Sequence, residues 1–197
     1  MSRLALVGGG ARSGKSAFAL KLAMARGERR VFVATAEAFD DEMRDRIRRH
    51  AAERGEDFET VEAPRELEAE IARLAIAPHD VDVVVIDCLT LWLSNLLLGD
   101  LSQEAIEARV EGLASALSSS AFDTILVTNE VGMGLVPETP LGRAFRDIAG
   151  RAHQRLARSA DEVYLAALGT MLRLRPGPVD IVALAEPATI PKRAARA

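Results

Sequence analysis

The feature that most constrains this chain is a short glycine-rich stretch near its start. Residues 9–16, GGARSGKS, match the pattern G-x-x-x-x-G-K-[ST]. An apolar run from Leu4 to Val7 precedes the stretch, and a helical pattern rich in alanine follows it from Ser16. Glycines after a strand let backbone N–H groups turn toward an anion, and the start of a helix adds positive potential there. The sequence therefore predicts a phosphate-binding loop between a strand and a helix, and a glycine-rich turn without a ligand is the alternative.

Each residue type in this loop has an expected task. The Lys15 ammonium supplies positive charge to the β- and γ-phosphates of a nucleotide, which makes it a candidate catalytic residue. The Ser16 hydroxyl is a candidate ligand of Mg²⁺. The predicted nucleotide-binding residues of the loop are Gly9, Gly10, Ala11, Arg12, Ser13, Gly14, Lys15 and Ser16.

A loop of this kind requires an acidic residue at the end of a neighbouring strand to hold Mg²⁺. Asp87 directly follows the largely apolar run from Val81 to Ile86, so it is the candidate second ligand. An aspartate after a strand also commonly caps the next helix, which is the alternative for Asp87. Asn129 and Glu130 follow a further apolar run. Their side chains either contact substrate or only form a cap and a turn of the chain.

Apolar runs alternate with helical patterns along the chain. The runs lie at residues 4–7, 31–34, 58–61, 81–86, 124–127 and 162–165, and the helical patterns at 16–24, 40–54, 65–74, 91–98, 103–117 and 141–158. An unbroken run such as Val83 to Ile86 is typical of a strand covered on both faces. We therefore expect one α/β domain, residues 1–175, with a mostly parallel sheet, helices on both faces, and the carboxyl ends of its strands on one edge.

Composition limits the binding partners and the cellular compartment expected for this domain. The net charge is -4, with 25 basic and 29 acidic residues, which does not favour a nucleic-acid binder. Cys88 is the only cysteine, so neither a disulfide nor a cysteine metal site is available, and a cytoplasmic location is expected. The apolar runs are too short for membrane insertion. Residues 176–197 contain proline and arginine and are expected to form a partly extended, frayed tail of open role.

The helical pattern at residues 40–54 carries a histidine in an unusual position. His50 falls on the same face of this predicted helix as Met43 and Ile47, so it points toward a core or a cleft. It is either a hydrogen-bonded core histidine or a nucleophile, because a neutral imidazole can attack phosphorus and hold a phosphoramidate. His79 and His153 lack such a setting. The arginines of this helix either contact phosphates or form a solvated basic face, and acidic neighbours favour the second reading for Arg44 and Arg48.

Several phrases together resemble one enzyme family. They are GGARSGKS (9–16), ATA (34–36), DDEM (40–43), RI (46–47) with His50 and Arg54, TLWLSNLL (90–97), VTNEVGMG (127–134) and FRDIAGR (145–151). Together they are similar to the bifunctional adenosylcobinamide kinase/adenosylcobinamide-phosphate guanylyltransferase of vitamin B12 assembly. The resemblance covers residues 3–170, and the phrase at 127–134 is far more specific than the phosphate-loop pattern.

The resemblance implies a RecA-like P-loop fold, a homotrimer and two reactions at one nucleotide site. The first moves the γ-phosphate of GTP or ATP to the hydroxyl of the aminopropanol arm of adenosylcobinamide. The second joins GMP from GTP to adenosylcobinamide phosphate, through a guanylylated His50. The resemblance also implies nucleotide contacts at Thr35, Ala36, Glu37, Ala51, Ala52, Glu53, Glu62 and Asp87.

Some members of that family carry two adjacent histidines where this chain has Arg49 and His50, so the family mechanism depends here on His50. Two other functions remain open. One is a simple P-loop small-molecule kinase without a histidine intermediate. The other is a RecA-like ATPase that acts on a partner or nucleic acid, which the aromatic content of 4% disfavours because single strands are bound by aromatic stacking.

Overall fold

The computed structural model describes residues 2–38, 41, 44–45, 48, 55–76 and 81–182. In this part of the chain, eight strands form one sheet in the order β3-β2-β4-β5-β1-β6-β7-β8. The strands β1 to β6 pair in parallel, and β7 and β8 extend one end of the sheet in antiparallel fashion. The strands are β1 (Leu4–Gly9), β2 (Arg30–Ala34), β3 (Glu59–Glu62), β4 (Val83–Asp87), β5 (Asp123–Asn129), β6 (Glu162–Ala167), β7 (Thr170–Arg175) and β8 (Asp180–Val182). The helices are α1 (Lys15–Met24), α3 (Leu67–Ile76), α4 (Leu89–Leu98), α5 (Gln103–Ser119) and α6 (Pro140–Ser159), with a 3-10 turn at Gly55–Asp57.

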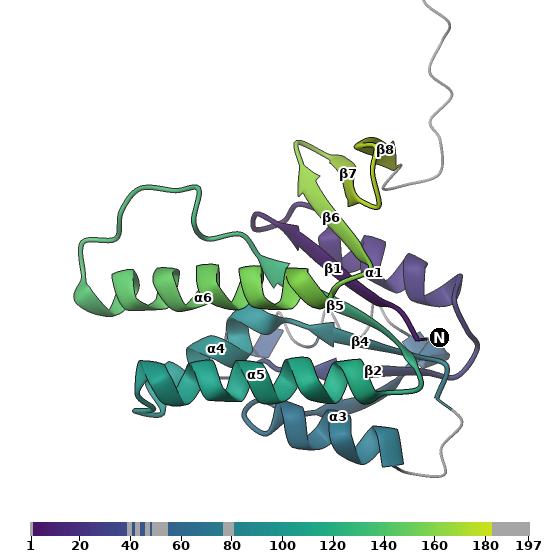
Figure 1. Cartoon of the computed structure of the whole chain (residues 1–197), viewed down its shortest axis with the longest axis horizontal. Coiled ribbons are helices and arrows are strands. Elements are labelled where there is room, and N and C mark those ends of the chain that lie inside the picture. The colour runs from purple at the N-terminus through teal and green to yellow at the C-terminus, as the bar shows by residue number, and fades with distance from the viewer. Residues whose placement is uncertain are drawn as a thin grey trace, which may run out of the picture.

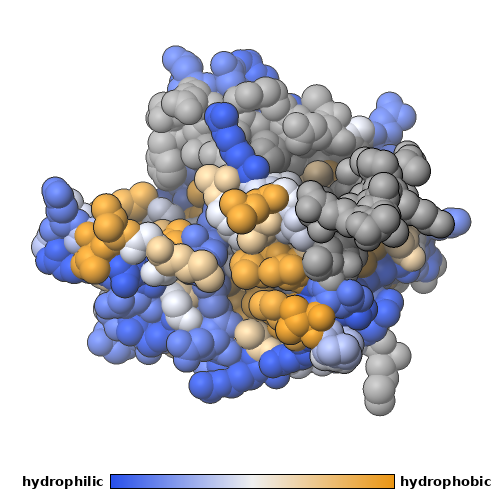
Figure 2. Space-filling model, turned by 90° about the horizontal axis from the view of Figure 1, so that it is seen from above, coloured by the Kyte–Doolittle hydropathy of each residue, from blue (hydrophilic) through white to orange (hydrophobic). Residues whose placement is uncertain are grey.

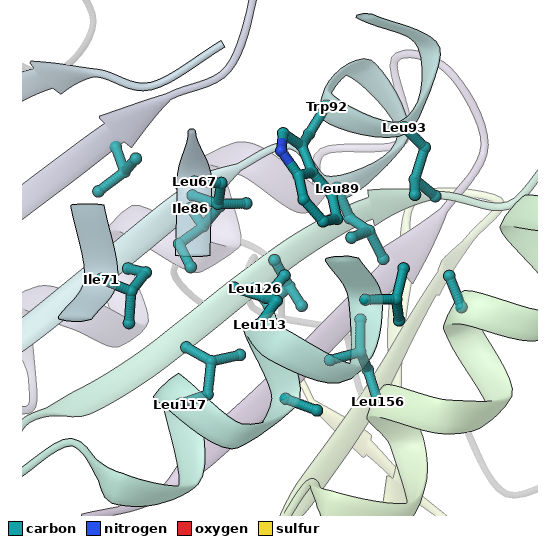
Figure 3. Close-up of a cluster of buried hydrophobic side chains, with 14 of the residues drawn as sticks. Leu67, Ile71, Ile86, Leu89, Trp92, Leu93, Leu113, Leu117, Leu126 and Leu156 are labelled. Carbon is teal, nitrogen blue, oxygen red and sulfur yellow. The ribbon is translucent and has the colours of Figure 1, made fainter. Parts of the chain in front are cut away.

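Helices cover both faces of this sheet (Figure 1). α1 packs on one face against β1, β4 and β5, whereas α4 and α6 pack on the other face, with α5 and α3 beside them. The larger core cluster lies under these four helices (Figure 3). Within it, Trp92 is fully buried, and its indole N–H donates to the Arg65 carbonyl at 2.8 Å. The apolar body of the indole therefore adds to the core while its one polar group stays satisfied.

The central strand β4 shows why the sheet is buried on both sides. Val84 and Ile86 belong to the cluster under α3 to α6, and Val83 and Val85 belong to the cluster under α1. All four side chains are fully buried. Burying one such side chain contributes about 1.5–3 kcal/mol relative to leaving it exposed, so an unbroken apolar strand is favoured here.

The pairing register brings the carboxyl ends of five parallel strands to one edge. Gly9 at the end of β1 pairs with Asn129 at the end of β5. Asp87 at the end of β4 pairs with Val127 on one side and with Ala34 of β2 on the other. The edge then continues from Ala34 to Glu62 of β3. Every polar residue that follows a predicted strand thus reaches the same edge as the phosphate loop.

The six predicted strands and five of the six predicted helices are present, with ends shifted by a few residues. Of the helix expected at 40–54, Asp41, Arg44, Asp45 and Arg48 have helical backbone, and the other residues lie outside the described part. β7 was not expected, and β8 lies beyond the expected end of the domain at residue 175. Within the described residues, none of the helices combines the length and apolar character that crossing a bilayer requires.

Candidate nucleotide site

The phosphate loop has the backbone that its glycines predict. Gly9 has φ of 156°, and a Cβ there would lie 2.8 Å from the Ala166 carbonyl oxygen, closer than real Cβ atoms come. Gly14 has φ of 87° and occupies the position just before α1. A side chain at either position would strain the loop, because positive φ favours glycine. The two glycines therefore let the loop pass close to β6 and then turn into the helix.

Lys15 lies inside this loop and not on the protein surface. It is the first residue of α1, is 6% exposed, and donates a hydrogen bond from Nζ to the Gly10 carbonyl at 3.1 Å. Ser16 beside it is half-buried. The Ser13 hydroxyl is buried without a hydrogen-bond partner among the described residues. Because buried hydroxyls are rarely left unsatisfied, this oxygen is suited to meet a ligand held by the loop.

Asp87 and Lys15 both act on the same buried thiol. Burial and, to a lesser extent, the Asp87 carboxylate raise the pKa of Cys88 to about 11, and Lys15 acts in the opposite direction. The Asp87 carboxylate and the Lys15 ammonium group therefore both lie close enough to Cys88 to change the pKa of its thiol. Asp87 ends β4 and is half-buried, while Cys88 occupies the capping position of α4 without a side-chain cap. The helix-capping alternative for Asp87 is thus wrong.

Thr35 fastens the end of β2 to the turn after β4. Its Oγ1 accepts a hydrogen bond from the Cys88 N–H and donates to the Cys88 carbonyl, both at 2.7 Å. The Asn95 amide of α4 in turn donates to the Thr35 carbonyl at 2.8 Å and to the Pro64 carbonyl at 2.9 Å. Thr35 is fully buried and Asn95 is 2% exposed. These polar side chains hold three strand ends of the edge in fixed positions.

The bonds of Thr35 lead to a prediction about stability. We expect Thr35→Val to lower the free energy of unfolding by about 1–3 kcal/mol, because the nearly isosteric valine leaves the buried Cys88 N–H without its acceptor. Urea unfolding followed by circular dichroism measures the change. Thr60→Val is the matched control, since Thr60 is an exposed β3 residue and its replacement is expected to change stability by less than about 0.5 kcal/mol. Equal unfolding midpoints for the two variants would contradict this role of Thr35.

The other predicted nucleotide contacts divide into two groups. Ala36 and Glu37 are half-buried just after β2, and Glu37 pairs with Arg65 at 2.9 Å, while Glu62 is exposed at the end of β3. They therefore line the edge that continues from the phosphate loop through Asp87. The predicted nucleophile and the contacts that follow it, His50, Ala51, Ala52 and Glu53, lie outside the described residues.

The arginines near His50 that the structure describes are exposed and paired. Arg44 bonds to Asp41 at 2.6 Å, and Arg48 pairs with Asp45. The interpretation of these two arginines as a solvated basic face is therefore confirmed.

The structure also shows polar contacts that the sequence did not reveal. The Asn129 amide donates to the Thr90 hydroxyl at 3.0 Å, and this contact ties the end of β5 to α4. Glu130 accepts a hydrogen bond from the Gly132 N–H at 2.6 Å, so its carboxylate shapes the turn after β5. Its own N–H donates to the Gly9 carbonyl at 3.0 Å. Asn129 and Glu130 thus brace the site. Two signals pointed to them in the sequence: their place after an apolar run and the specific phrase at residues 127–134.

His153 of α6 lies behind this turn. Its Nε2 is 2.7 Å from the Thr128 hydroxyl, and its Nδ1 is 3.8 Å from the Glu130 carboxylate. Burial lowers the pKa of His153, and Glu130 partly offsets that effect. A neutral His153 therefore links α6 to the end of β5, which is a structural role that neighbouring sequence does not reveal.

The donors at this edge fit a magnesium ion that arrives with a nucleotide. Ser16 offers a hydroxyl and Asp87 a carboxylate, and Mg²⁺ prefers oxygen ligands and is usually held by one or two carboxylates together with substrate phosphates. Among the described residues, no group of three or more His, Cys, Asp or Glu forms a metal cage. The residues present thus suit an ion whose remaining ligands are oxygens of the triphosphate.

A wide hollow also lies at the opposite edge of the sheet. It has a volume of about 1160 Å³ and is lined by Arg3, Arg26, Arg29, Asp82 and Asp123, among others. Arg3 and Arg26 pair with Asp123, and Arg29 pairs with Asp82, so these charges already compensate one another. Neither a glycine-rich loop nor the carboxyl end of a parallel strand lines this hollow. We therefore place the nucleotide site at the phosphate loop.

A glycine-rich loop between a parallel strand and a helix, with an aspartate at the end of β4, defines a P-loop nucleotide-binding protein of the RecA-like fold class. A solved structure of the RadB recombinase shares this fold, with a TM-score of 0.53 over 87% of this chain and 79% of that chain, at 16% sequence identity.

The chain belongs to the family described as cobinamide kinase / cobinamide phosphate guanyltransferase, whose model matches residues 5–174. It is 40% identical over 182 residues to the bifunctional adenosylcobalamin biosynthesis protein CobU of Escherichia coli (strain K12), an alignment that covers 86% of this chain and 98% of that protein. It is 40% identical over 174 residues to the bifunctional adenosylcobalamin biosynthesis protein CobP of Pseudomonas aeruginosa, covering 88% and 98%. The chain is therefore an enzyme of the bifunctional kinase and guanylyltransferase class, and both rival functions are set aside.

Proposed function

We propose that this chain carries out both reactions at the nucleotide site described above. It first moves the γ-phosphate of GTP or ATP to the hydroxyl of the aminopropanol arm of adenosylcobinamide. It then joins GMP from GTP to adenosylcobinamide phosphate and forms GDP-cobinamide. The observation that carries this proposal is the sheet register, because it brings the phosphate loop, Asp87 and Thr35 to one edge.

In the kinase step, the substrate hydroxyl oxygen attacks the γ-phosphorus and the bond to the β–γ bridging oxygen breaks. The hydroxyl proton is released, and the nucleoside diphosphate leaves. The loop N–H groups and the Lys15 ammonium stabilise negative charge on the phosphates as the bond breaks. Ser16 and Asp87 would hold Mg²⁺, which neutralises phosphate charge when bound.

In the guanylyl step, a ring nitrogen of His50 attacks the α-phosphorus of GTP, and pyrophosphate leaves. A phosphate oxygen of adenosylcobinamide phosphate then attacks the same phosphorus. The P–N bond breaks, the imidazole is returned, and GDP-cobinamide is released. This role for His50 follows from the family resemblance. The face that His50 shares with Met43 and Ile47 on the predicted helix is compatible with it.

The role of Asp87 can be tested by a conservative substitution. We expect Asp87→Asn to lower kcat of both reactions by about 10- to 100-fold, because the neutral amide is a weaker partner for the metal ion. We also expect the variant to need more Mg²⁺ for half-maximal nucleotide binding, measured by fluorescence of a labelled GTP analogue. Asp100→Asn is the control, since Asp100 is exposed after the far end of α4 and its φ of 61° suits asparagine. An unchanged Mg²⁺ requirement in Asp87→Asn would remove Asp87 from the site.

The assembly, location and domain division also remain part of the proposal. We propose a homotrimer in the cytoplasm, with a catalytic domain at residues 1–175 whose sheet is extended by β8 (Asp180–Val182), and a tail over the rest of residues 176–197. The single cysteine supports a reducing compartment, and the trimer follows from the family resemblance. The net charge of -4 supports the expectation that nucleic acid is not a partner.

A further inference from the structure

The loop between β5 and α6, residues 131–139, exposes an unusual amount of apolar surface. Met133 is 78% exposed, Leu135 is 96% exposed and Val136 is 66% exposed, and Leu141 in the first turn of α6 is 51% exposed. Figure 2 shows hydrophobic side chains gathered at the left, where this loop and the start of α6 lie. Single exposed apolar residues are ordinary, but several together on one segment mark a binding surface.

This apolar loop is held in place by its polar groups. At its start, the Gly132 N–H donates to the Glu130 carboxylate at 2.6 Å. At its end, Arg143 of α6 donates to the carbonyls of Pro137 and Glu138 at 3.0 and 2.7 Å. Thr139 then caps α6 by accepting from the Gly142 N–H at 3.1 Å. Both ends of the loop are thus anchored while the apolar side chains face outward, so less of the loop has to be ordered when a ligand covers them.

The apolar loop starts beside the phosphate loop. Asn129 pairs with Gly9 in the sheet, and the N–H of Glu130 donates to the Gly9 carbonyl at 3.0 Å. Figure 1 shows the loop leaving β5 on the side of the sheet where β1 ends. A substrate that rests on the loop therefore lies on a segment that begins directly at the phosphate-binding residues.

We propose that Met133, Leu135 and Val136 hold the corrin ring of cobinamide during both reactions. This inference rests on the proposed function. The corrin ring is a broad macrocycle whose carbon framework and methyl groups are apolar, and residues 131–137 carry no charged side chain. Branched side chains and a flexible methionine adapt well to such an irregular apolar surface. The ring would rest on the loop while its aminopropanol arm extends to the phosphate loop.

The test compares cobinamide binding with nucleotide binding in the full chain. We expect Leu135→Ser to raise the Kd and KM for cobinamide about tenfold, and Leu135→Ser with Val136→Ser to raise them further, because exposed apolar contacts are lost. The KM for GTP and the kcat are expected to stay within about twofold of the wild type, because the phosphate loop is unchanged. Isothermal titration with cobinamide alone and steady-state kinetics provide the two readouts.

Ile76→Ser is the matched control. Ile76 is 85% exposed and ends α3, which leads back to the start of β4 at the opposite edge of the sheet. Light scattering of each variant measures its assembly. An unchanged Kd for cobinamide in the serine variants overturns the inference. If their assembly changes while this Kd does not, the loop is assigned to contacts between copies of the chain. If the wild type binds cobinamide on this loop but phosphorylates none, the proposed function fails while the inference stands.

Discussion

Lys15→Ala is expected to remove both group transfers while the protein stays folded. The Lys15 side chain lies inside the phosphate loop, where Nζ donates to the Gly10 carbonyl at 3.1 Å. In Lys15→Ala, the negative charge that develops on the phosphates is no longer stabilised by the Lys15 ammonium group, at a place shielded from water. We expect kcat of each reaction to fall by about 10²- to 10³-fold, as when one charge-stabilising donor is removed from an active site. Chromatography of cobinamide phosphate and of GDP-cobinamide measures the two reactions separately.

Lys21→Ala is the matched control for Lys15→Ala. Lys21 lies on the same helix but is exposed, so its removal changes the net charge equally without touching the loop. We expect this variant to retain both activities. Thermal unfolding of the two variants separates loss of chemistry from loss of fold. The role of Lys15 would be refuted if a folded Lys15→Ala protein retained either reaction at the wild-type rate.

His50→Ala is expected to separate the two reactions. The kinase step needs no histidine, so cobinamide phosphate still forms, but guanylyl transfer loses its nucleophile. We expect GDP-cobinamide formation to fall by roughly 10⁴-fold or more, as when a nucleophile is removed from a covalent mechanism. Cobinamide phosphate should therefore accumulate when the variant is given cobinamide and GTP, and mass spectrometry of the products would show it.

Two controls sharpen the His50 experiment. Supplying cobinamide phosphate directly isolates the second reaction from the first. His79→Ala removes a different histidine, one without an inward setting in the sequence, and is expected to keep both reactions. Equal loss of the two reactions in His50→Ala would indicate a structural role for His50 and would contradict its role as the nucleophile.

The sequence predicted the parts of the fold and site that depend on local patterns. Val83 to Ile86 form one unbroken apolar run, which identified a strand covered on both faces, and Asp87 stands where that run stops. Once the strands are parallel, the rules of chain crossover place their carboxyl ends together, so Asp87 could be assigned to the same edge as the phosphate loop.

The hairpin of β6 and β7 could not be predicted in this way. Leu168 and Gly169 join these strands, with φ of 51° and 74°. Positive φ at both positions is the geometry of a tight hairpin turn, which asparagine–glycine commonly signals and leucine does not. With that signal missing, residues 170–175 were placed in the domain but were not predicted to form a strand.

The contacts that brace the site were also beyond local patterns. Thr35 bonds to Cys88 and Asn95 bonds to Thr35, across 53 and 60 residues of sequence. Neither threonine nor asparagine carries a local sign of such a partner, because the contact exists only after β2 and β4 have paired. The same reasoning applies to Thr128 and His153, which meet across 25 residues. Only the paired strands of the folded chain bring these polar groups together.

Covalent labelling tests the central claim most directly. The wild type and His50→Ala are each incubated with Mg²⁺ and α-³²P-GTP without cobinamide, then denatured and counted. A guanylylated histidine predicts label on the wild type that is stable in alkali and lost in acid, and none on His50→Ala. Label that persists on His50→Ala, or no label on a wild type that binds GTP and phosphorylates cobinamide, would contradict the histidine intermediate and leave a plain P-loop kinase.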